Sequence, residues 1–210
     1  LTEQREGAAD RAVMILEQAL SATEARLANP KGWGLTEDAL CVVFHSHGIE
    51  VEPPGRLLYY PVLPDQREAP ERLFRQAEEF EFSAQDYQAA VVRCRDLSLS
   101  PDPAIRAGAL LRLARNLRKM GQRPAALDIC DQLGRMESAT LGGIPADLVA
   151  RRLRCSILEE LDRSTDLRRE AGTLDSDLRM GRWRLDRASY LFYSEQANVW
   201  LGSPRNPEPV

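Results

Sequence analysis

The stretch of sequence that decides the fold runs from 86 to 133, where one pattern occurs twice. The segment DYQAAVVRCRDL at 86–97 is followed 36 residues later by QRPAALDICDQL at 122–133. In both copies a small alanine comes four residues before a cysteine, and that cysteine comes three residues before a leucine. This spacing puts all three side chains on one helix face and predicts close packing on a neighbouring helix. A repeat in the mid-thirties with such a face is typical of solenoids built from helical hairpins.

The apolar periodicity continues from Glu71 almost to the end of the chain and predicts further helices. Pro103 suits a first helical turn, because its missing N–H would have no partner there. Gly121, shortly after two cationic residues, suits a helix end. Residues 139–145 are predicted to be a loop that lengthens the third repeat. The predicted helices lie near 70–83, 86–98, 103–119, 123–135, 146–161, 164–178 and 185–201.

The first part of the chain predicts a different organisation. Residues 2–29 carry apolar side chains at three- and four-residue steps, which predicts one long helix with a narrow apolar stripe. This stripe is too narrow for a fully buried helix, so we expect it to pair two copies of the chain as a homodimer. Its members are Ala9, Ala12, Val13, Leu16, Ala19, Leu20, Thr23 and Leu27.

Two short apolar runs follow, at 39–44 and 56–62, on either side of a Pro/Gly-rich connection. They predict a small β-hairpin or strand pair, which must pack on helices to be stable. Tyr59 and Tyr60, together with Phe44, are predicted to form its packing face. The predicted fold class is therefore mostly α with a small β element. The expected units are a long helix plus strand unit over 1–69, a helical-hairpin stack over 70–201 and a tail over 202–210.

Composition limits the classes of function. The chain has 210 residues, is 43% hydrophobic and carries a formal net charge of −4. Without a general basic field, nucleic acid is not an expected partner. No apolar run reaches the length of about 18 residues needed to span a bilayer. Because the chain starts at Leu1 without an initiator methionine, we expect it to be a segment of a longer protein.

The residues that could hold a metal or carry chemistry are scattered. Cys41, Cys94, Cys130 and Cys155 form no C-x-x-C pair, so core thiols are expected, with a disulfide as the alternative. His45 and His47 could form a metal pair, but an exposed turn is the favoured interpretation. No nucleophile–base pair, metal set or phosphate loop is present. We therefore expect a non-catalytic segment that needs no cofactor and no metal.

The middle repeat resembles the tetratricopeptide consensus. The likeness covers about half of the chain, and the third repeat, around 148–174, departs from it with Leu167 in place of the small alanine and no turn glycine. The residues that carry the resemblance are Leu110, Leu113, Ala114 and Leu117 in the first helix, Gly121 at the turn, and Ala126, Cys130 and Leu133 in the second helix.

The whole chain resembles a sensor region found in front of some bacterial histidine kinases. The resemblance rests on RLLYYP at 56–61, SPDPAIRAGALLRLARNLRK at 100–119, GIPADL at 143–148 and GRWRL at 181–185. It implies the sensory input region of a membrane-bound two-component sensor histidine kinase, in an extracytoplasmic (periplasmic) location. The kinase core and the membrane attachment would then lie in flanking segments outside this chain. The alternative is a cytoplasmic tetratricopeptide adaptor that assembles proteins.

A dense polar cluster on the helix at 103–119 is the candidate binding site. In tetratricopeptide proteins the first helix of each repeat lines the concave surface, so these side chains are expected to face a groove. Guanidinium groups there suit a small anionic ligand, or a peptide or protein, through bidentate hydrogen bonds. The alternative is a solvated face paired with Asp128, Asp131 or Glu159. The candidate residues are Arg112, Arg115, Asn116, Arg118 and Lys119, with Arg75 and Arg152 from neighbouring repeats.

Overall fold

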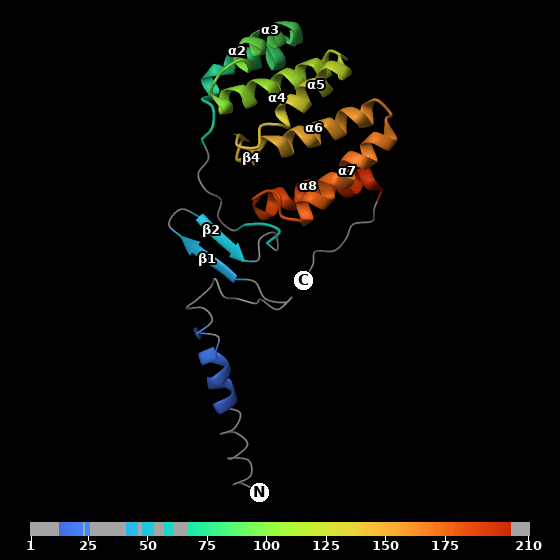
Figure 1. Cartoon of the computed structure of the whole chain (residues 1–210). Coiled ribbons are helices and arrows are strands. Elements are labelled where there is room, and N and C mark those ends of the chain that lie inside the picture. The colour runs from blue at the N-terminus through green and yellow to red at the C-terminus, as the bar shows by residue number, and fades with distance from the viewer. Residues whose placement is uncertain are drawn as a thin grey trace.

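The structure is a computed structural model that describes residues 13–22, 24–25, 41–45, 48–52, 57–60 and 67–202. It is mostly α with a small β element, as the sequence predicts (Figure 1). The C-terminal two thirds form a stack of antiparallel helical hairpins, which carries most of the buried core.

Three helical pairs and a closing helix make up the stack. The first pair is α2 (Arg75–Glu78), continued by a π-helix (Glu79–Ala84), with α3 (Tyr87–Ser98). The second is α4 (Pro103–Lys119) with α5 (Arg123–Leu133), and the third is α6 (Ala146–Glu160) with α7 (Ser164–Arg179). Helix α8 (Arg187–Leu201) closes the stack. The predicted helices are confirmed with ends within two residues, except that the segment predicted as one helix at 70–83 also contains a 3₁₀ turn (Glu71–Leu73).

Local signals explain where these helices begin and turn. Asp86, Asp102 and Asp186 cap the starts of α3, α4 and α8, each accepting a hydrogen bond from a backbone N–H of the first turn. Gly121 follows α4 with φ 75°, a left-handed conformation that glycine adopts without strain. After α6 the same conformation falls on Asp162, with φ 54°, so the third turn forms without a glycine.

The repeat face predicted from the sequence is the packed face of the stack. Ala90, Cys94, Ala126 and Cys130 are all buried, and Ala126 belongs to the same core cluster as Leu113. The contact between α4 and Phe74, the residue before α2, is also close. A Cβ added at Gly108 would lie 2.6 Å from Cζ of Phe74, so a larger residue would force that ring to move.

The predicted loop at 139–145 is in fact a tight β-hairpin. Strand β3 (Thr140–Leu141) pairs antiparallel with β4 (Ile144–Pro145). Gly142 and Gly143 form the two-residue turn, with φ values of 61° and 77°. Two consecutive positive φ values are what the commonest hairpin turn requires, and two glycines satisfy it. This hairpin leads directly into α6.

The small sheet is present, but its second strand lies elsewhere than predicted. Strand β1 (Cys41–His45) pairs antiparallel with β2 (Gly48–Glu52), so the second strand comes before the proline-rich segment. The predicted strand at 56–62 is wrong where the structure describes it, because 57–60 forms no ladder with β1. The backbone of this segment instead bonds to the helical stack, where the N–H of Tyr60 donates to the carbonyl of Leu185 at 2.7 Å.

Residues 57–60 connect the strand unit to the stack. Tyr60 is buried with Ile49 and Val51 of β2, while Tyr59 lies 6.0 Å from the ring of Tyr190 on α8. The packing role predicted for both tyrosines is confirmed. The packing role predicted for Phe44 is wrong, because this side chain is 69% exposed at the end of β1.

The N-terminal helix is described over 13–22 and 24–25, and the rest of the helix and tail predicted at 2–29 and 202–210 lies outside the described residues, apart from Gly202. In Figure 1 it lies apart from the stack. All of its described side chains are exposed, including Val13, Leu16 and Leu20. In the described part of the chain, no helix combines the length and apolar character needed to cross a bilayer.

Candidate functional site

The predicted polar cluster on α4 faces acidic residues of the first helical pair. Arg112 donates two hydrogen bonds to Oε1 of Glu78, at 2.9 Å from Nε and 2.5 Å from Nη2. Its guanidinium also lies 3.9 Å from the centre of the Phe74 ring and donates to the carbonyl of Gly108. Arg112 therefore fixes α4 against α2 with most of its donors already used.

Glu81 is the centre of this cluster. It is 2% exposed and is the buried residue of the π-helix, an irregularity that is common at functional sites. Arg115 donates two hydrogen bonds to its carboxylate at 2.6 and 2.5 Å, Lys119 donates one at 2.8 Å, and the Asn116 amide donates one at 3.2 Å. Burial acts to raise the pKa of Glu81, but the hydrogen bonds from Arg115 and Lys119 outweigh it and lower the pKa.

The other predicted residues lie outside this group. Arg118 on α4 and Arg123 on α5 both donate to Glu160 at the end of α6, at 2.8 and 2.9 Å. Arg152 lies 4.9 Å from the centre of the Phe192 ring, and Arg75 is exposed on α2.

The acidic partners differ from those considered in the sequence. Glu78, Glu81 and Glu160 pair with the α4 cluster, whereas Asp131 pairs with Arg154 and Glu159 accepts from the Trp200 indole. A groove that binds an anion on this face remains a prediction.

A second charged cluster, not predicted from the sequence, occupies the third repeat. Aligning the last residues of α4 and α6, Lys119 and Glu160, places Arg151 and Arg154 at the positions of Leu110 and Leu113. Both leucines are 4% exposed core residues of the second repeat. The third repeat therefore holds two arginines at positions where the second repeat holds two leucines of its apolar core.

These two arginines are paired with carboxylates on both neighbouring helices. Arg151 donates to Asp177 on α7 at 2.7 Å and lies 3.6 Å from Glu170. Arg154 pairs with Asp131 on α5, and its Nε lies 3.4 Å from Glu170. The charges thus bridge α5, α6 and α7 at the place where leucines pack in the second repeat.

The segment between α7 and α8 completes this cluster. The indole N–H of Trp183 donates to Oδ2 of Asp147 at 2.8 Å, and Arg182 donates to the same oxygen at 3.4 Å. The guanidinium carbons of Arg151 and Arg182 lie 5.6 and 5.4 Å from the centre of the Trp183 ring. Oδ1 of Asp147 is buried and has no hydrogen-bond partner among the described residues.

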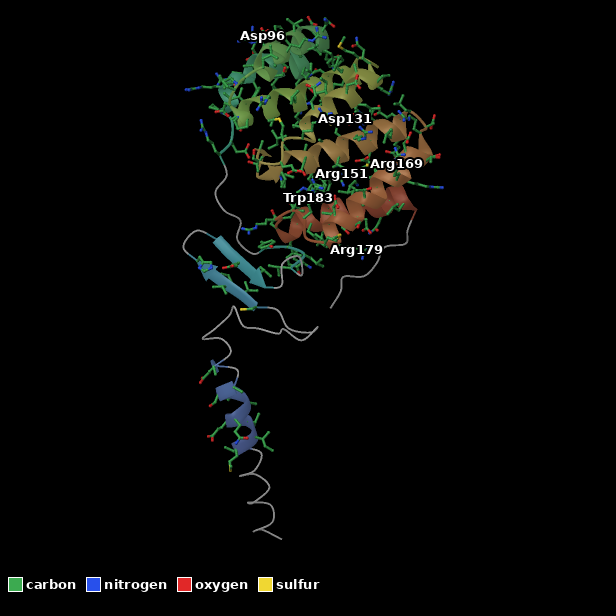
Figure 2. All side chains as sticks on the ribbon, in the orientation of Figure 1. Asp96, Asp131, Arg151, Arg169, Arg179 and Trp183 are labelled. Atoms are coloured by element: carbon green, nitrogen blue, oxygen red, sulfur yellow. The ribbon has the colours of Figure 1, made fainter. Side chains whose placement is uncertain are left out.

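Two hollows meet at Asp147, each with a volume of about 320 Å³. The first lies where α5, α6 and α7 meet, and its charged lining residues are Asp131, Arg135, Asp147, Arg151, Arg154 and Glu170. The second is lined by Glu137, Asp147, Arg182 and Trp183. Figure 2 labels Asp131, Arg151 and Trp183, which mark the course of the cluster from α5 to the start of α8. We call the two hollows together the Asp147 cleft.

Acidic groups outnumber basic ones in the ion-pair network of the Asp147 cleft. Three guanidiniums, those of Arg151, Arg154 and Arg182, share five carboxylates. The network therefore carries a net charge of −2, and the exposed Arg135 at its edge reduces the excess to −1. The carboxylates are Asp131, Glu137, Asp147, Glu170 and Asp177.

Neither the thiols nor the described histidine adds a reactive or metal-binding group. All four cysteines are free and buried, as predicted for core thiols, and burial raises the pKa of Cys94 to about 11 and that of Cys130 and Cys155 to about 12. His45 is exposed and lies 3.2 Å from Glu50. Over the described residues, no group of three or more His, Cys, Asp or Glu side chains could hold a metal ion.

Comparison with known proteins finds no matching family model, no matching curated protein and no matching solved structure.

Proposed function

We propose that this chain is the non-catalytic sensory input region of a membrane-bound two-component sensor histidine kinase, located outside the cytoplasm. In this proposal the helical stack binds a ligand or partner, and two copies of the chain pair through the N-terminal helix. The flanking segments supply the membrane attachment and the kinase core.

The observation that carries the proposal is the exposed apolar surface of the N-terminal helix. Val13, Leu16 and Leu20 follow the three- and four-residue spacing of a coiled-coil seam and are 51%, 62% and 63% exposed. Met14 and Ile15 beside them are 59% and 66% exposed. So much exposed apolar surface on one helix is typical of an interface, and a second copy of the same seam would bury it.

A route for a signal through the chain is supported by the contacts of residues 57–60. The hydrogen bond from Tyr60 to Leu185 and the contact between Tyr59 and Tyr190 join the strand unit to the start of α8. Movement of α8 against its neighbours would therefore move the strand unit, which follows the N-terminal helix in the chain. A ligand drives such a movement only if it binds one arrangement more tightly than the other.

The test uses the full protein that carries this chain, with kinase activity measured as transfer of phosphate from ATP to a histidine. Insertions of one to four residues before Val13 rotate the helix by about 100° per residue relative to any preceding segment. We expect the autophosphorylation rate to vary periodically across the series, with unchanged circular dichroism of the isolated chain. Absence of phosphohistidine in the full protein, or equal rates in all insertions, would contradict the proposal.

A further inference from the structure

The Asp147 cleft contains one guanidinium that is loosely held. Arg182 lies between α7 and α8 and contacts three carboxylates, those of Glu137 at 3.1 Å, Asp177 at 3.3 Å and Asp147 at 3.4 Å. Each contact is longer than the usual distance of about 2.8 Å for a charge-assisted hydrogen bond. Its side chain is 39% exposed, compared with 19% for Arg151 and 27% for Arg154. Arg182 is therefore the member of the network that can leave with the least disturbance.

Asp147 supplies the fixed anchor. Its side chain is 7% exposed, and it lines both hollows of the cleft. Trp183 holds one of its oxygens, while Oδ1 has no donor among the described residues. A buried carboxylate oxygen without a donor is destabilising, and native structures nearly always satisfy such a group. In the part of the chain that the structure describes, Oδ1 of Asp147 therefore lacks a hydrogen-bond donor, and a donor bound there would lie beside the ring of Trp183.

The charge and spacing of the cleft define the chemistry of that donor. The ion-pair network has a net charge of −2, or −1 with Arg135 included, which favours a cation. The face of Trp183 adds attraction for an ammonium or guanidinium group. Within the described residues, the carboxylates are not grouped closely enough to hold a metal ion. Two hollows that share Asp147 suit an elongated molecule with a positive charge at each end.

We propose that the Asp147 cleft binds an organic dication of the diamine class, whose first ammonium donates to Oδ1 of Asp147 and displaces Arg182 from Oδ2. The second ammonium lies toward Asp131 and Glu170 in the first hollow. In the absence of the ligand, the guanidinium of Arg182 lies 3.4 Å from Oδ2 of Asp147, and Oδ1 has no donor among the described residues. This inference rests on the proposed function, because it names the ligand class that the sensory region detects.

Release of Arg182 also provides the link to the signal route. Arg182 lies three residues before Leu185, whose carbonyl accepts the hydrogen bond from Tyr60. A diamine that displaces Arg182 changes the segment leading into α8 at the point where the strand unit is attached. The ligand thereby favours one of two arrangements of this segment, as a sensory ligand must.

Isothermal titration of the purified chain with 1,4-diaminobutane tests the inference. We expect saturable binding at one site per chain. Asp147→Asn, which keeps an acceptor for Trp183, should weaken binding at least about tenfold, because a ligand cation loses its buried charged partner. Arg182→Gln should strengthen binding by about tenfold, because the competing cation is absent. The exposed substitution Glu137→Gln tests the cleft without a risk to folding and should weaken binding less than Asp147→Asn.

Matched controls distinguish binding in the Asp147 cleft from nonspecific attraction between the ligand and the charged surface of the chain. Asp175→Asn and Arg179→Gln remove a partly exposed ion pair of α7 outside the cleft and should leave binding unchanged. Butylamine, with one charge, should bind more weakly than the diamine, and Mg²⁺ should not compete. The inference is overturned if neither the natural chain nor Arg182→Gln binds the diamine saturably, or if Asp147→Asn and Glu137→Gln both bind it unchanged. Since binding is measured on the chain alone, its failure is distinct from a failure of the kinase insertions.

Discussion

The second and third repeats of the stack have the same helical arrangement but different interiors. In the second repeat, Leu110 and Leu113 are buried in the core. In the third repeat the matching positions hold Arg151 and Arg154, which pair with acidic side chains on α5 and α7. Helix lengths are nearly equal, since α4 spans Pro103–Lys119 and α6 spans Ala146–Glu160.

The difference shows that one backbone arrangement can be filled in two ways. Apolar side chains stabilise the second repeat by burial, whereas buried ion pairs contribute little net stability, because the loss of hydration offsets their attraction. A fold that needed only stability would keep the leucines. We infer that the third repeat gives up part of its core stability for a polar cleft that binds, and that the second repeat serves as the rigid support.

The largest effect is expected when the arginines are moved into the second repeat. Leu110→Arg with Leu113→Arg places two charges in a core that has no carboxylates arranged to receive them. Burial of unpaired charge costs several kcal/mol per ion, which is comparable to the whole stability of a typical domain of about 5–15 kcal/mol. We expect loss of the cooperative thermal transition in circular dichroism. A folded double variant with a normal melting temperature would contradict the comparison.

A smaller effect is expected from the residue at the helix crossing. Ala126 is fully buried, while the equivalent position of the third repeat is Leu167. Ala126→Leu should overpack the second repeat and destabilise it by about 1–3 kcal/mol. The measurement is urea unfolding, with Ala188→Leu on the exposed face of α8 as the matched control. Equal unfolding midpoints for the two variants would show that the repeat register is wrong.

Glu81 allows a test of how a fully partnered buried carboxylate behaves. Its pKa is lowered in the folded chain, so its contribution to stability is present above the ordinary glutamate pKa and is lost as the pH falls through the lowered value. Glu81→Gln should reduce stability by about 1–2 kcal/mol at neutral pH, because the partly exposed Arg115 and Lys119 lose a charged partner. The difference from the natural chain should shrink below about pH 4.

Melting temperatures of both chains between about pH 7 and about pH 3 provide this measurement. If the difference in melting temperature between the natural chain and Glu81→Gln stays constant or grows on acidification, the lowered pKa of Glu81 is contradicted.

The smallest effect is expected at the exposed ion pairs of α7. Asp166 pairs with Arg163 and Arg169, and hydrogen bonds from Arg163 lower its pKa. Because both arginine partners are exposed and water screens the pairs, Asp166→Asn should leave the melting temperature unchanged within error. A clear loss of stability would mean that ion pairs of the third repeat outside the cleft also contribute to stability. That result would contradict the distinction between the cleft and the rest of the repeat.

Helices could be predicted from the sequence because their signals are local. The capping aspartates Asp86, Asp102 and Asp186 lie beside the helix starts that they stabilise, and the apolar period marks each face. The small sheet was harder to predict, because its register depends on which carbonyl accepts the hydrogen bond from each backbone N–H. Tyr60 donates to Leu185, which is 125 residues further along the chain. No local pattern could indicate that choice.

The candidate site was only partly predictable for the same reason. The arginines of α4 are visible in the sequence, but their partners Glu78 and Glu81 come from another repeat, and the π-helix that buries Glu81 has no recognised sequence signal. The Asp147 cleft did leave a signal. Arg151 and Arg154 fall at the core positions of the tetratricopeptide-like pattern once the ends of α4 and α6 are aligned, and charged residues at core positions indicate a special site.

Native-state hydrogen exchange at low and high salt tests the central comparison most directly. In about 1 M sodium chloride the Debye length falls to about 3 Å, which weakens partly exposed ion pairs and leaves apolar packing intact or strengthened. Helix α4 also carries ion pairs, with Glu78, Glu81 and Glu160, but its core positions Leu110 and Leu113 are apolar. We therefore predict that amides of α6 and α7 lose more protection at high salt than amides of α4 do. An equal response of the two repeats would contradict the account, because the third repeat would then owe its packing to the same forces as the second.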